Sequence, residues 1–293
     1  STIPTERHAT MGRTGGTPRE SIMKNPYLIE PPAVINFSGG RSSGFMLHKI
    51  LEAYQWELPE GIEVVFCNTG LEHKATYDFI QEFSEHYQVA INWLEYDLDE
   101  DQKHTFKIVD YGSASRSGEP FSKLNDKYER LPNPVHRYCT GKLKITTSRY
   151  FIKSLGWTEW ESCIGLRKDE PRRVHKFNQD VKYETGIFPM WEAGHYQDDV
   201  LEFWASNHFD LNLPNKANLW GNCVGCHLKG LNKLIEIADQ DPEQLGWWSR
   251  EEIKHDNLFR RDRPSYRKIL NFTKNQGSFN FVDEETIPCF CTD

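Results

Sequence analysis

A short apolar run that ends in two glycines constrains the fold of this chain more than any other feature. Residues 33–37 are apolar apart from Asn36, Ser38-Gly39-Gly40 follow, and apolar side chains then recur at helical spacing from Phe45 to Tyr54. A buried strand, a tight turn and a helix produce this pattern. Glycines let backbone N–H groups approach an anion, and a helix N-terminus favours negative charge. The run therefore predicts a phosphate-binding loop, although a glycine turn with a serine cap would share the pattern.

Similar strand-like runs recur downstream, at 63–67, 90–96, 161–165 and 186–189. Helical spacing follows the first of them over 77–83, and a further helix is indicated from Asp198 to Ser206. Strands that alternate with helices pair in parallel and carry helices on both sheet faces. We therefore expect an α/β fold with a doubly wound, mostly parallel, Rossmann-like sheet in residues 26–215.

The remaining segments differ from this pattern. Residues 1–25 are polar and rich in glycine, proline and arginine, which predicts a flexible leader. Residues 97–134 are irregular and polar, which predicts a lid-like insertion over the active-site edge. Residues 216–293 contain a helical pattern over 231–239 and most of the cysteines, so we expect a C-terminal helical, cysteine-bearing extension.

Charge and cysteine content restrict the class of protein. A net charge of −8 repels nucleic acid, so that partner is possible through a local basic patch but is not favoured. Apolar runs are too short for a membrane span, so no membrane partner is expected. Seven cysteines without a secretory signal indicate a reducing compartment, where grouped thiols bind metal or do redox chemistry. We therefore expect a cytoplasmic protein.

Six of the seven cysteines fall into three pairs. Cys67 and Cys163 lie inside apolar strand runs, which is typical of small packed side chains. Cys223 and Cys226 form a C-x-x-C pair whose thiolates can bind one metal centre from a single turn, although zinc, an iron–sulfur cluster and a redox dithiol all use this spacing. The chain ends with Cys289-Phe290-Cys291, whose alternating side chains put both thiols on one side. His136 and His227 could replace a cysteine ligand.

Several motifs together resemble the phosphoadenosine phosphosulfate reductase family of the PP-loop superfamily. They match in order from about Ala33 to Lys229, as the segments 37–43, 68–70, 138–144, 165–173, 189–191 and 198–200. The resemblance implies an adenine-nucleotide site formed by Ser38, Gly39, Gly40, Arg41, Ser42, Ser43, Asn68, Thr69, Gly70, Gly165, Arg167, Arg172 and Arg173. From the residues alone, the arginine-rich part of that segment could equally be a solvated loop with internal ion pairs.

The chain departs from the family at two loop positions. Ser42 occupies a position where the family usually has an acidic residue, and Asn68 occupies one where aspartate is more common in the family. Both changes leave magnesium binding uncertain and suit a nucleotide that bears sulfate or phosphate at least as well as metal–triphosphate.

Iron–sulfur members of the family suggest the ligands and the nucleophile. The resemblance implies a 4Fe–4S cluster on Cys139, Cys223, Cys226 and either Cys289 or Cys291, because Thr140 stands where those members have a second upstream cysteine. The remaining tail thiol, Cys291 or Cys289, would attack the substrate sulfur as the catalytic residue. Tetrahedral zinc is the alternative metal.

These observations favour a sulfonucleotide-reductase-like enzyme that reduces a phosphosulfate nucleotide with a thioredoxin-like reductant. One alternative is an ATP-dependent adenylating sulfurtransferase that thiolates tRNA or DNA, and another is a non-catalytic, zinc-stabilised nucleotide-binding protein. Trp247, Trp248 and Phe259 lie near several arginines and could stack nucleic-acid bases. We favour a packing role for them, against the sheet.

Overall fold

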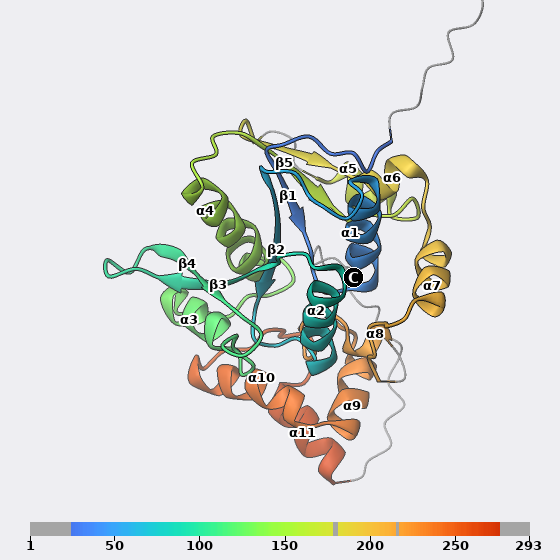
Figure 1. Ribbon diagram of the computed structural model, residues 1–293. Helices are drawn as coiled ribbons and strands as arrows, with labels where there is room; N and C mark the ends of the chain where they lie inside the picture. Colours follow the sequence, from blue (N-terminus) through green and yellow to red (C-terminus); the bar gives the residue numbers. More distant parts are fainter. Residues whose placement is uncertain (1–24, 178–180, 215–216, 276–293) are drawn as a thin grey trace, which may run out of the picture.

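The computed structural model describes residues 25–177, 181–214 and 217–275, and a six-stranded sheet lies at its centre (Figure 1). The strand order is β4-β3-β2-β1-β5-β6. All neighbouring strands pair in parallel except β3 and β4, which are antiparallel. The strands are β1 (Ala33–Asn36), β2 (Ile62–Asn68), β3 (Asn92–Leu98), β4 (His104–Val109), β5 (Trp160–Ile164) and β6 (Glu184–Ile187). The predicted α/β fold with a mostly parallel sheet is confirmed.

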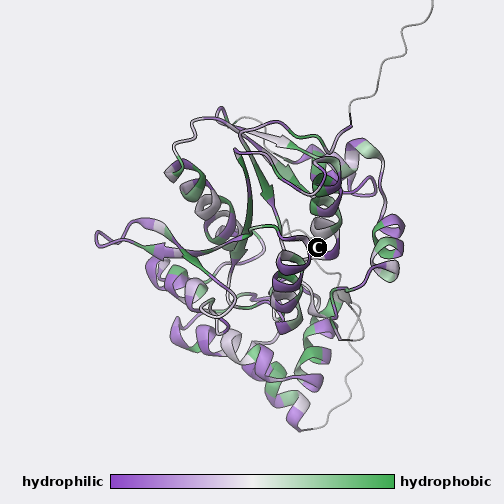
Figure 2. Ribbon diagram, in the orientation of Figure 1, coloured by the Kyte–Doolittle hydropathy of each residue, from purple (hydrophilic) through white to green (hydrophobic). Residues whose placement is uncertain are grey.

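Helices cover both faces of the sheet. Helices α1 (Arg41–Ala53), α2 (Lys74–Tyr87) and α7 (Gln197–Ser206) share one apolar core with β1 and β2, and α4 (Thr147–Ser154) packs on the opposite face. Successive strand residues point to opposite faces, so Ile35 faces the first core and Val34 faces the second. Figure 2 shows the central strands as the most hydrophobic part of the fold. The sheet is therefore doubly wound, as expected.

The expectation of an irregular segment over 97–134 is wrong. It contains β4 and helix α3 (Glu119–Tyr128). Strand β4 was not predicted because it lies at an exposed sheet edge and its sequence is half polar. Helix α3 has a proline in its first turn, which is a helix-start signal in the sequence. Helix α3 packs on the C-terminal helices, where Asn125 Nδ2 donates to Glu251 Oε2 at 2.7 Å. A lid function for this segment stays a prediction.

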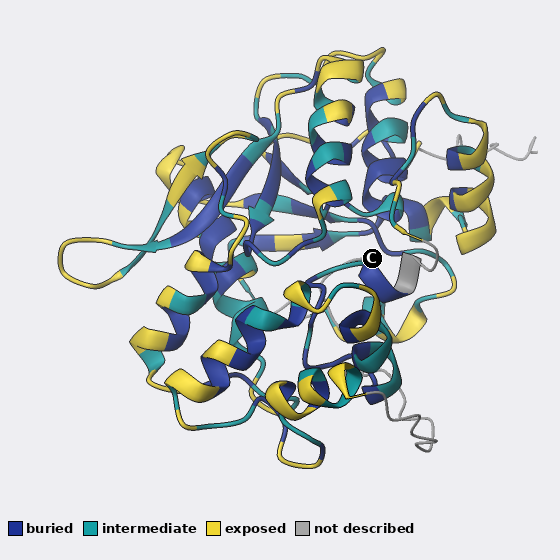
Figure 3. Ribbon diagram, turned by 90° about the horizontal axis from the view of Figure 1, so that it is seen from below, coloured by how far each residue is buried: buried dark blue, intermediate teal, exposed yellow. Residues whose placement is uncertain are grey.

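The C-terminal part forms a second apolar core with α3. The helices of this C-terminal part are α8 (Ala217–Trp220), α9 (Leu231–Gln240), α10 (Glu243–Lys254) and α11 (Tyr266–Lys274). Trp248 and Phe259 are fully buried among them. The predicted helix over 231–239 is confirmed. The tryptophans have the expected packing role, but they pack on α3 and the C-terminal helices and not against the sheet. Figure 3 shows buried and exposed residues alternating along the helices, as expected for amphipathic helices on a core.

Three short elements complete the fold around the sheet. They are the π-helix η1 (Thr140–Thr146), α5 (Pro171–His175) and α6 (Pro189–Ala193). Within the described ranges no helix is long and apolar enough to cross a membrane. The predicted leader spans residues 1–25, of which 1–24 lie outside the described residues, and both tail cysteines also lie outside them.

Candidate functional site

Two loops meet at the point in the sheet where the order of successive strands changes from one side of β1 to the other. From β1 the chain proceeds through β2 to β3, and it later returns to place β5 on the other side of β1. Ligands of open α/β sheets bind in the crevice at the carboxyl ends of such strands. A Cβ on Gly165, just after β5, would lie 3.2 Å from the Ser43 Cα, so the two loops are in contact there. The fold thus brings the predicted phosphate loop and the basic segment together.

The loop after β1, residues 38–43, has the conformation expected for the predicted phosphate-binding loop, and we call it the anion cradle. Gly39 has φ +78°, and a Cβ there would lie 2.7 Å from Thr76 Cγ2 and 2.8 Å from Ile80 Cδ1 of α2. Ser43 Oγ accepts from Ser38 N at 3.2 Å and donates to Gly40 O at 3.0 Å, which fixes the turn.

The first turn of α1 leaves its N–H groups available to a ligand. Its first i to i−4 hydrogen bond runs from Gly44 N to Gly40 O at 3.0 Å, so the N–H groups of residues 41–43 precede it and have no acceptor within the helix. This turn carries no acidic residue. Both features favour an anion at the loop.

Arg167 is the cation that joins this cradle. Its Nη1 donates to Ser42 Oγ at 2.7 Å, and its Nε donates to Asp169 Oδ1 at 3.2 Å. The Arg167 side chain is 12% exposed, so its charge is only partly screened by water. Arg173 pairs with Glu170, whose other carboxylate oxygen lies 3.6 Å from Arg167 Nη2. Arg172 is exposed on α5. Of the three predicted arginines, the structure brings Arg167 to the loop.

Arg41 has a different partner. Its Nε and Nη2 each donate to one carboxylate oxygen of Asp210 at 2.7 Å, and Nη2 also donates to Leu211 O at 3.0 Å. Trp204 Nε1 donates to Arg41 O at 2.9 Å. These contacts anchor the start of α1 to the segment after α7. Asp210 follows no motif, so sequence reasoning could not identify this pairing.

The motif after β2 closes the neighbouring strand end. Asn68 Nδ2 donates to Glu95 Oε1 at 2.7 Å and to Ser115 O at 2.9 Å, while Asn68 Oδ1 accepts from Gly70 N at 3.0 Å. Gly70 has φ +80°, and a Cβ on it would lie 2.5 Å from Ser115 Oγ. Asn68 and Gly70 therefore join β2 to β3 and to the loop before α3. Their predicted contacts with nucleotide stay predictions.

The C-x-x-C turn docks directly on this motif. Cys226 N donates to Cys223 O at 3.1 Å within the turn, and Val224 N donates to Leu71 O at 2.9 Å. The Cys223 Sγ lies 3.3 Å from Thr69 Oγ1. A Cβ on Gly225 would lie 2.2 Å from Trp248 Nε1, so only glycine fits under that indole. The cysteine turn thus lies at the carboxyl end of β2, next to the strand that carries the anion cradle.

The described cysteines include three of the predicted metal ligands. Cys139 precedes η1 and packs against the apolar cluster that includes Cys223 and Cys226. In the part of the chain that the structure describes, no three His, Cys, Asp or Glu residues are grouped to hold a metal ion. A cysteine pair is by itself too few ligands for the tetrahedral zinc or four-thiolate cluster sites expected from the sequence. The described residues alone therefore do not fit a closed metal centre, and the tail cysteines lie outside them.

The two candidate histidines are in opposite environments. His136 is exposed, and His227 is 1% exposed with its ring stacked on Phe259 at 5.6 Å. Burial, together with Arg263 and Arg137, lowers the pKa of His227 to about 3. Its imidazole is therefore neutral at physiological pH.

The remaining described cysteines agree with a packing role. Cys163 is fully buried in the core beneath α1, and burial raises its pKa well above the usual value. Burial also raises the pKa of Cys67 to about 12. Neither thiol is thus activated for chemistry.

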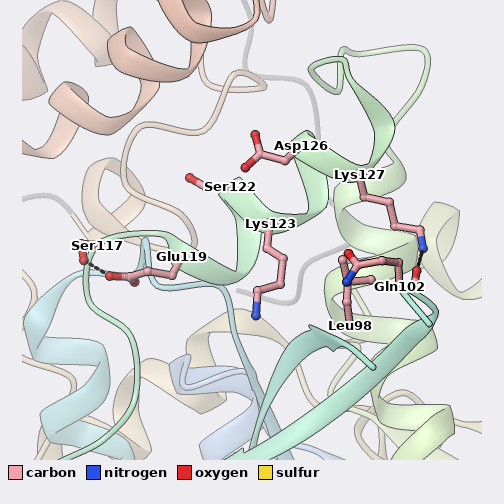
Figure 4. Close-up of a pocket in the computed structure, with 8 residues that line it drawn as sticks. All are labelled: Leu98, Gln102, Ser117, Glu119, Ser122, Lys123, Asp126 and Lys127. Atoms are coloured by element: carbon pink, nitrogen blue, oxygen red, sulfur yellow. Dashed lines mark hydrogen bonds between the residues drawn. The ribbon is translucent and has the colours of Figure 1, made fainter. Parts of the chain in front are cut away.

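A separate pocket lies between α3 and the β3–β4 hairpin (Figure 4). Its volume is about 690 Å³, and it is lined by Leu98, Gln102, Ser117, Glu119, Ser122, Lys123, Asp126 and Lys127. Lys123 pairs with Asp97, and Lys127 donates to Gln102 O. The pocket contains none of the candidate residues, and its lysines already have partners.

The comparison with protein families agrees with this geometry. The family model of the phosphoadenosine phosphosulfate reductase domain matches residues 32–192, from the residue before β1 to the end of α6, which is more than half of the chain. The chain belongs to this family. The matched segment includes the anion cradle, Asn68 to Gly70, Cys139 and Arg167, whereas the C-x-x-C turn lies beyond it.

Curated relatives match a larger share of the chain than the family model does. An uncharacterized nin region protein of Escherichia phage lambda is 29% identical over 219 residues, which are 72% of this chain and 71% of that protein. Two uncharacterized proteins of Methanocaldococcus jannaschii are 26% and 21% identical over 81% and 73% of this chain. This chain spans 45% and 46% of their length.

Two solved structures are similar at low scores. The phosphoadenylyl-sulfate reductase of Candida auris, in a phosphate complex, has a TM-score of 0.37 and 15% identity, over 65% of this chain and 77% of that one. The U34-tRNA thiolase NcsA of Methanococcus maripaludis, with its 4Fe–4S cluster, has a TM-score of 0.38 and 14% identity, over 83% and 82%. The family assignment therefore depends on the family model.

Proposed function

We propose that this protein is an enzyme that binds an adenine nucleotide carrying sulfate at the carboxyl ends of β1 and β5 and transfers its sulfur to a thiol. The observation that carries the proposal is the contact of Arg167 Nη1 with Ser42 Oγ at 2.7 Å. It places a partly buried guanidinium, which is also paired with Asp169, beside the first turn of α1, so an anion in the cradle would meet both the N–H groups of residues 41–43 and a charged donor.

The charges around the cradle support a sulfonucleotide over a metal–triphosphate. The first turn of α1 has no acidic residue, and Asp169 and Glu170 are paired with Arg167 and Arg173. Glu95, near Asn68, is paired with Lys107 at 2.9 Å. Magnesium prefers carboxylate and water oxygens. A sulfonucleotide, which can bind without a metal ion, therefore fits these surroundings better than a metal–triphosphate.

The proposed reaction is a displacement at sulfur. A cysteine thiolate forms a bond to the sulfate sulfur, and the bond between that sulfur and the phosphate oxygen breaks with its electron pair going to the nucleotide. A dithiol reductant of the thioredoxin class then reduces the thiosulfonate and releases sulfite. Cys289 and Cys291 remain the proposed nucleophiles. The cradle and Arg167 would stabilise the negative charge on the leaving phosphate.

We retain a 4Fe–4S cluster on Cys139, Cys223, Cys226 and one tail cysteine as part of the proposal, with zinc as the alternative. The support is the donor set itself, because Cys139 packs against the same apolar cluster as the C-x-x-C turn. No step of the proposed reaction passes through the metal. Anaerobically purified protein should be brown, and colourless protein with one zinc per chain would replace the cluster by zinc.

Thermal unfolding with nucleotides tests the function. Adenosine 5′-phosphosulfate and its 3′-phosphorylated form should each raise the melting temperature without magnesium, because a ligand that binds the native state stabilises it. The Arg167→Ala protein should lose this shift. Stabilisation by ATP with magnesium alone would contradict the proposal and favour the adenylating sulfurtransferase. No stabilisation by any adenine nucleotide would contradict nucleotide binding altogether.

A further inference from the structure

Thr69 lies in the motif that the family resemblance assigns to nucleotide, yet its polar groups are directed elsewhere. The Thr69 hydroxyl donates to Glu72 Oε1 at 2.8 Å, and its backbone N donates to Glu72 Oε2 at 3.3 Å. The same hydroxyl oxygen lies 3.3 Å from Cys223 Sγ. The hydroxyl proton is directed to Glu72 and one oxygen lone pair accepts from Leu71 N at 3.3 Å, so the second lone pair remains for the Cys223 thiol.

Glu72 is held firmly enough to fix this hydroxyl. Its side chain is 2% exposed, and its Oε2 also accepts from Leu71 N at 3.2 Å and Tyr77 OH at 3.1 Å. Burial raises the pKa of Tyr77, so its hydroxyl stays protonated and remains a donor. Lys144 Nζ lies 4.0 Å from Oε1. A carboxylate with this many partners is held in one orientation, and it therefore also holds the Thr69 hydroxyl in one orientation.

The same network reaches the anion cradle through α2. Gly39 packs on Thr76 and Ile80, and Tyr77, the neighbour of Thr76, donates to Glu72. A continuous series of contacts therefore runs from the loop after β1, through the first turns of α2, to Glu72, Thr69 and Cys223. A displacement of the loop after β1 would therefore be felt at Glu72 and Thr69 through α2.

We propose that Thr69 is a positioning residue, which fixes the Cys223 sulfur at the end of β2 and makes its reactivity depend on whether the anion cradle is occupied. The nucleotide dependence rests on the proposed function, whereas the positioning of Cys223 does not. The role would explain why a threonine hydroxyl in the nucleotide motif contacts a cysteine more than 150 residues away in the sequence.

Alkylation of Cys223 tests both parts. Because a bound metal would block alkylation, the full chain is first freed of any iron or zinc with ferricyanide and EDTA, then reduced and desalted. It is treated with limiting iodoacetamide, and labelling of Cys223 and Cys226 is measured by peptide mass spectrometry. Thr69→Val should label Cys223 about fivefold faster than the unmodified protein, which corresponds to about 1 kcal/mol for one lost hydrogen bond. Thr69→Ser should restore the slow rate. Thr147→Val, which removes a buried hydroxyl that donates to Lys142 O, is the matched control and should leave the rate unchanged.

The nucleotide part uses adenosine 3′,5′-bisphosphate, which has no sulfate to transfer. It should change the Cys223 labelling rate at least threefold in the unmodified and Thr69→Ser proteins and leave Thr69→Val unaffected. Equal labelling of Thr69→Val and the unmodified protein without nucleotide would overturn the positioning role, whatever the nucleotide does. A melting-temperature shift with the bisphosphate but no change in labelling would overturn the coupling while leaving the proposed function intact. A bisphosphate that shifts neither measurement would count against the coupling and nucleotide binding together.

Discussion

Replacing Gly39 with alanine should destabilise the fold at the anion cradle. The residue has φ +78°, where a side chain other than glycine costs about 1–2 kcal/mol. The added Cβ would lie 2.7 Å from Thr76 Cγ2 and 2.8 Å from Ile80 Cδ1, and overpacking of this kind costs about 1–3 kcal/mol. Ile80 can move its side-chain end, whereas the β-branched Thr76 is stiff, so a total loss of about 3 kcal/mol is expected.

Urea unfolding followed by tryptophan fluorescence measures this loss. Gly141→Ala is the matched control, because nothing lies within 4 Å of a Cβ at that position and its φ is not positive. The control should be neutral or stabilised by about 0.5–1 kcal/mol. A Gly39→Ala protein that unfolds within about 0.5 kcal/mol of the unmodified protein would refute the argument from the loop conformation.

Three further results are expected. Arg167→Ala should weaken sulfonucleotide binding by about 10- to 100-fold in calorimetry, because a charged hydrogen bond is lost, and the exposed Arg267→Ala should not; equal losses would refute a specific contact. Asn125→Ala should lower the free energy of unfolding by about 1–3 kcal/mol, because buried Glu251 loses a donor; a change under about 0.5 kcal/mol would contradict the packing of α3 on α10. Burial lowers the pKa of His48 from 6.5 to about 4, so its neutral form stabilises the fold above pH 6.5 and this contribution is lost as the pH falls towards 4. His48→Gln should flatten that part of the pH dependence of the urea midpoint, and an unchanged slope would exclude His48 as a source.

The strands that carry the site were predictable because local pattern and tertiary role agree there. An apolar run before Ser38-Gly39-Gly40 can be buried only as a strand of a sheet covered on both faces, and β1 is that strand. Gly165 and Arg167 were expected at the next strand end, and parallel pairing of β1 with β5 brings them to the same edge. This part of the site follows from sequence order and sheet topology.

The partners of the site residues were not predictable, because they come from segments without a motif. Arg41 is bound by Asp210, which lies 169 residues away, and no local pattern identifies that pair. Strand β4 was missed because an exposed edge strand needs few apolar residues. The contact of Thr69 with Cys223 depends on how the C-terminal core docks on β2, which periodicity alone does not reveal.

A structure of the full chain with bound 3′-phosphoadenosine 5′-phosphosulfate tests the central claim most directly. The account predicts the sulfate-bearing phosphate at the N–H groups of residues 41–43, with the Arg167 guanidinium within hydrogen-bonding distance of it. A nucleotide bound instead in the pocket beside Lys123 and Lys127, or one whose phosphates make no contact with the loop after β1, would contradict it.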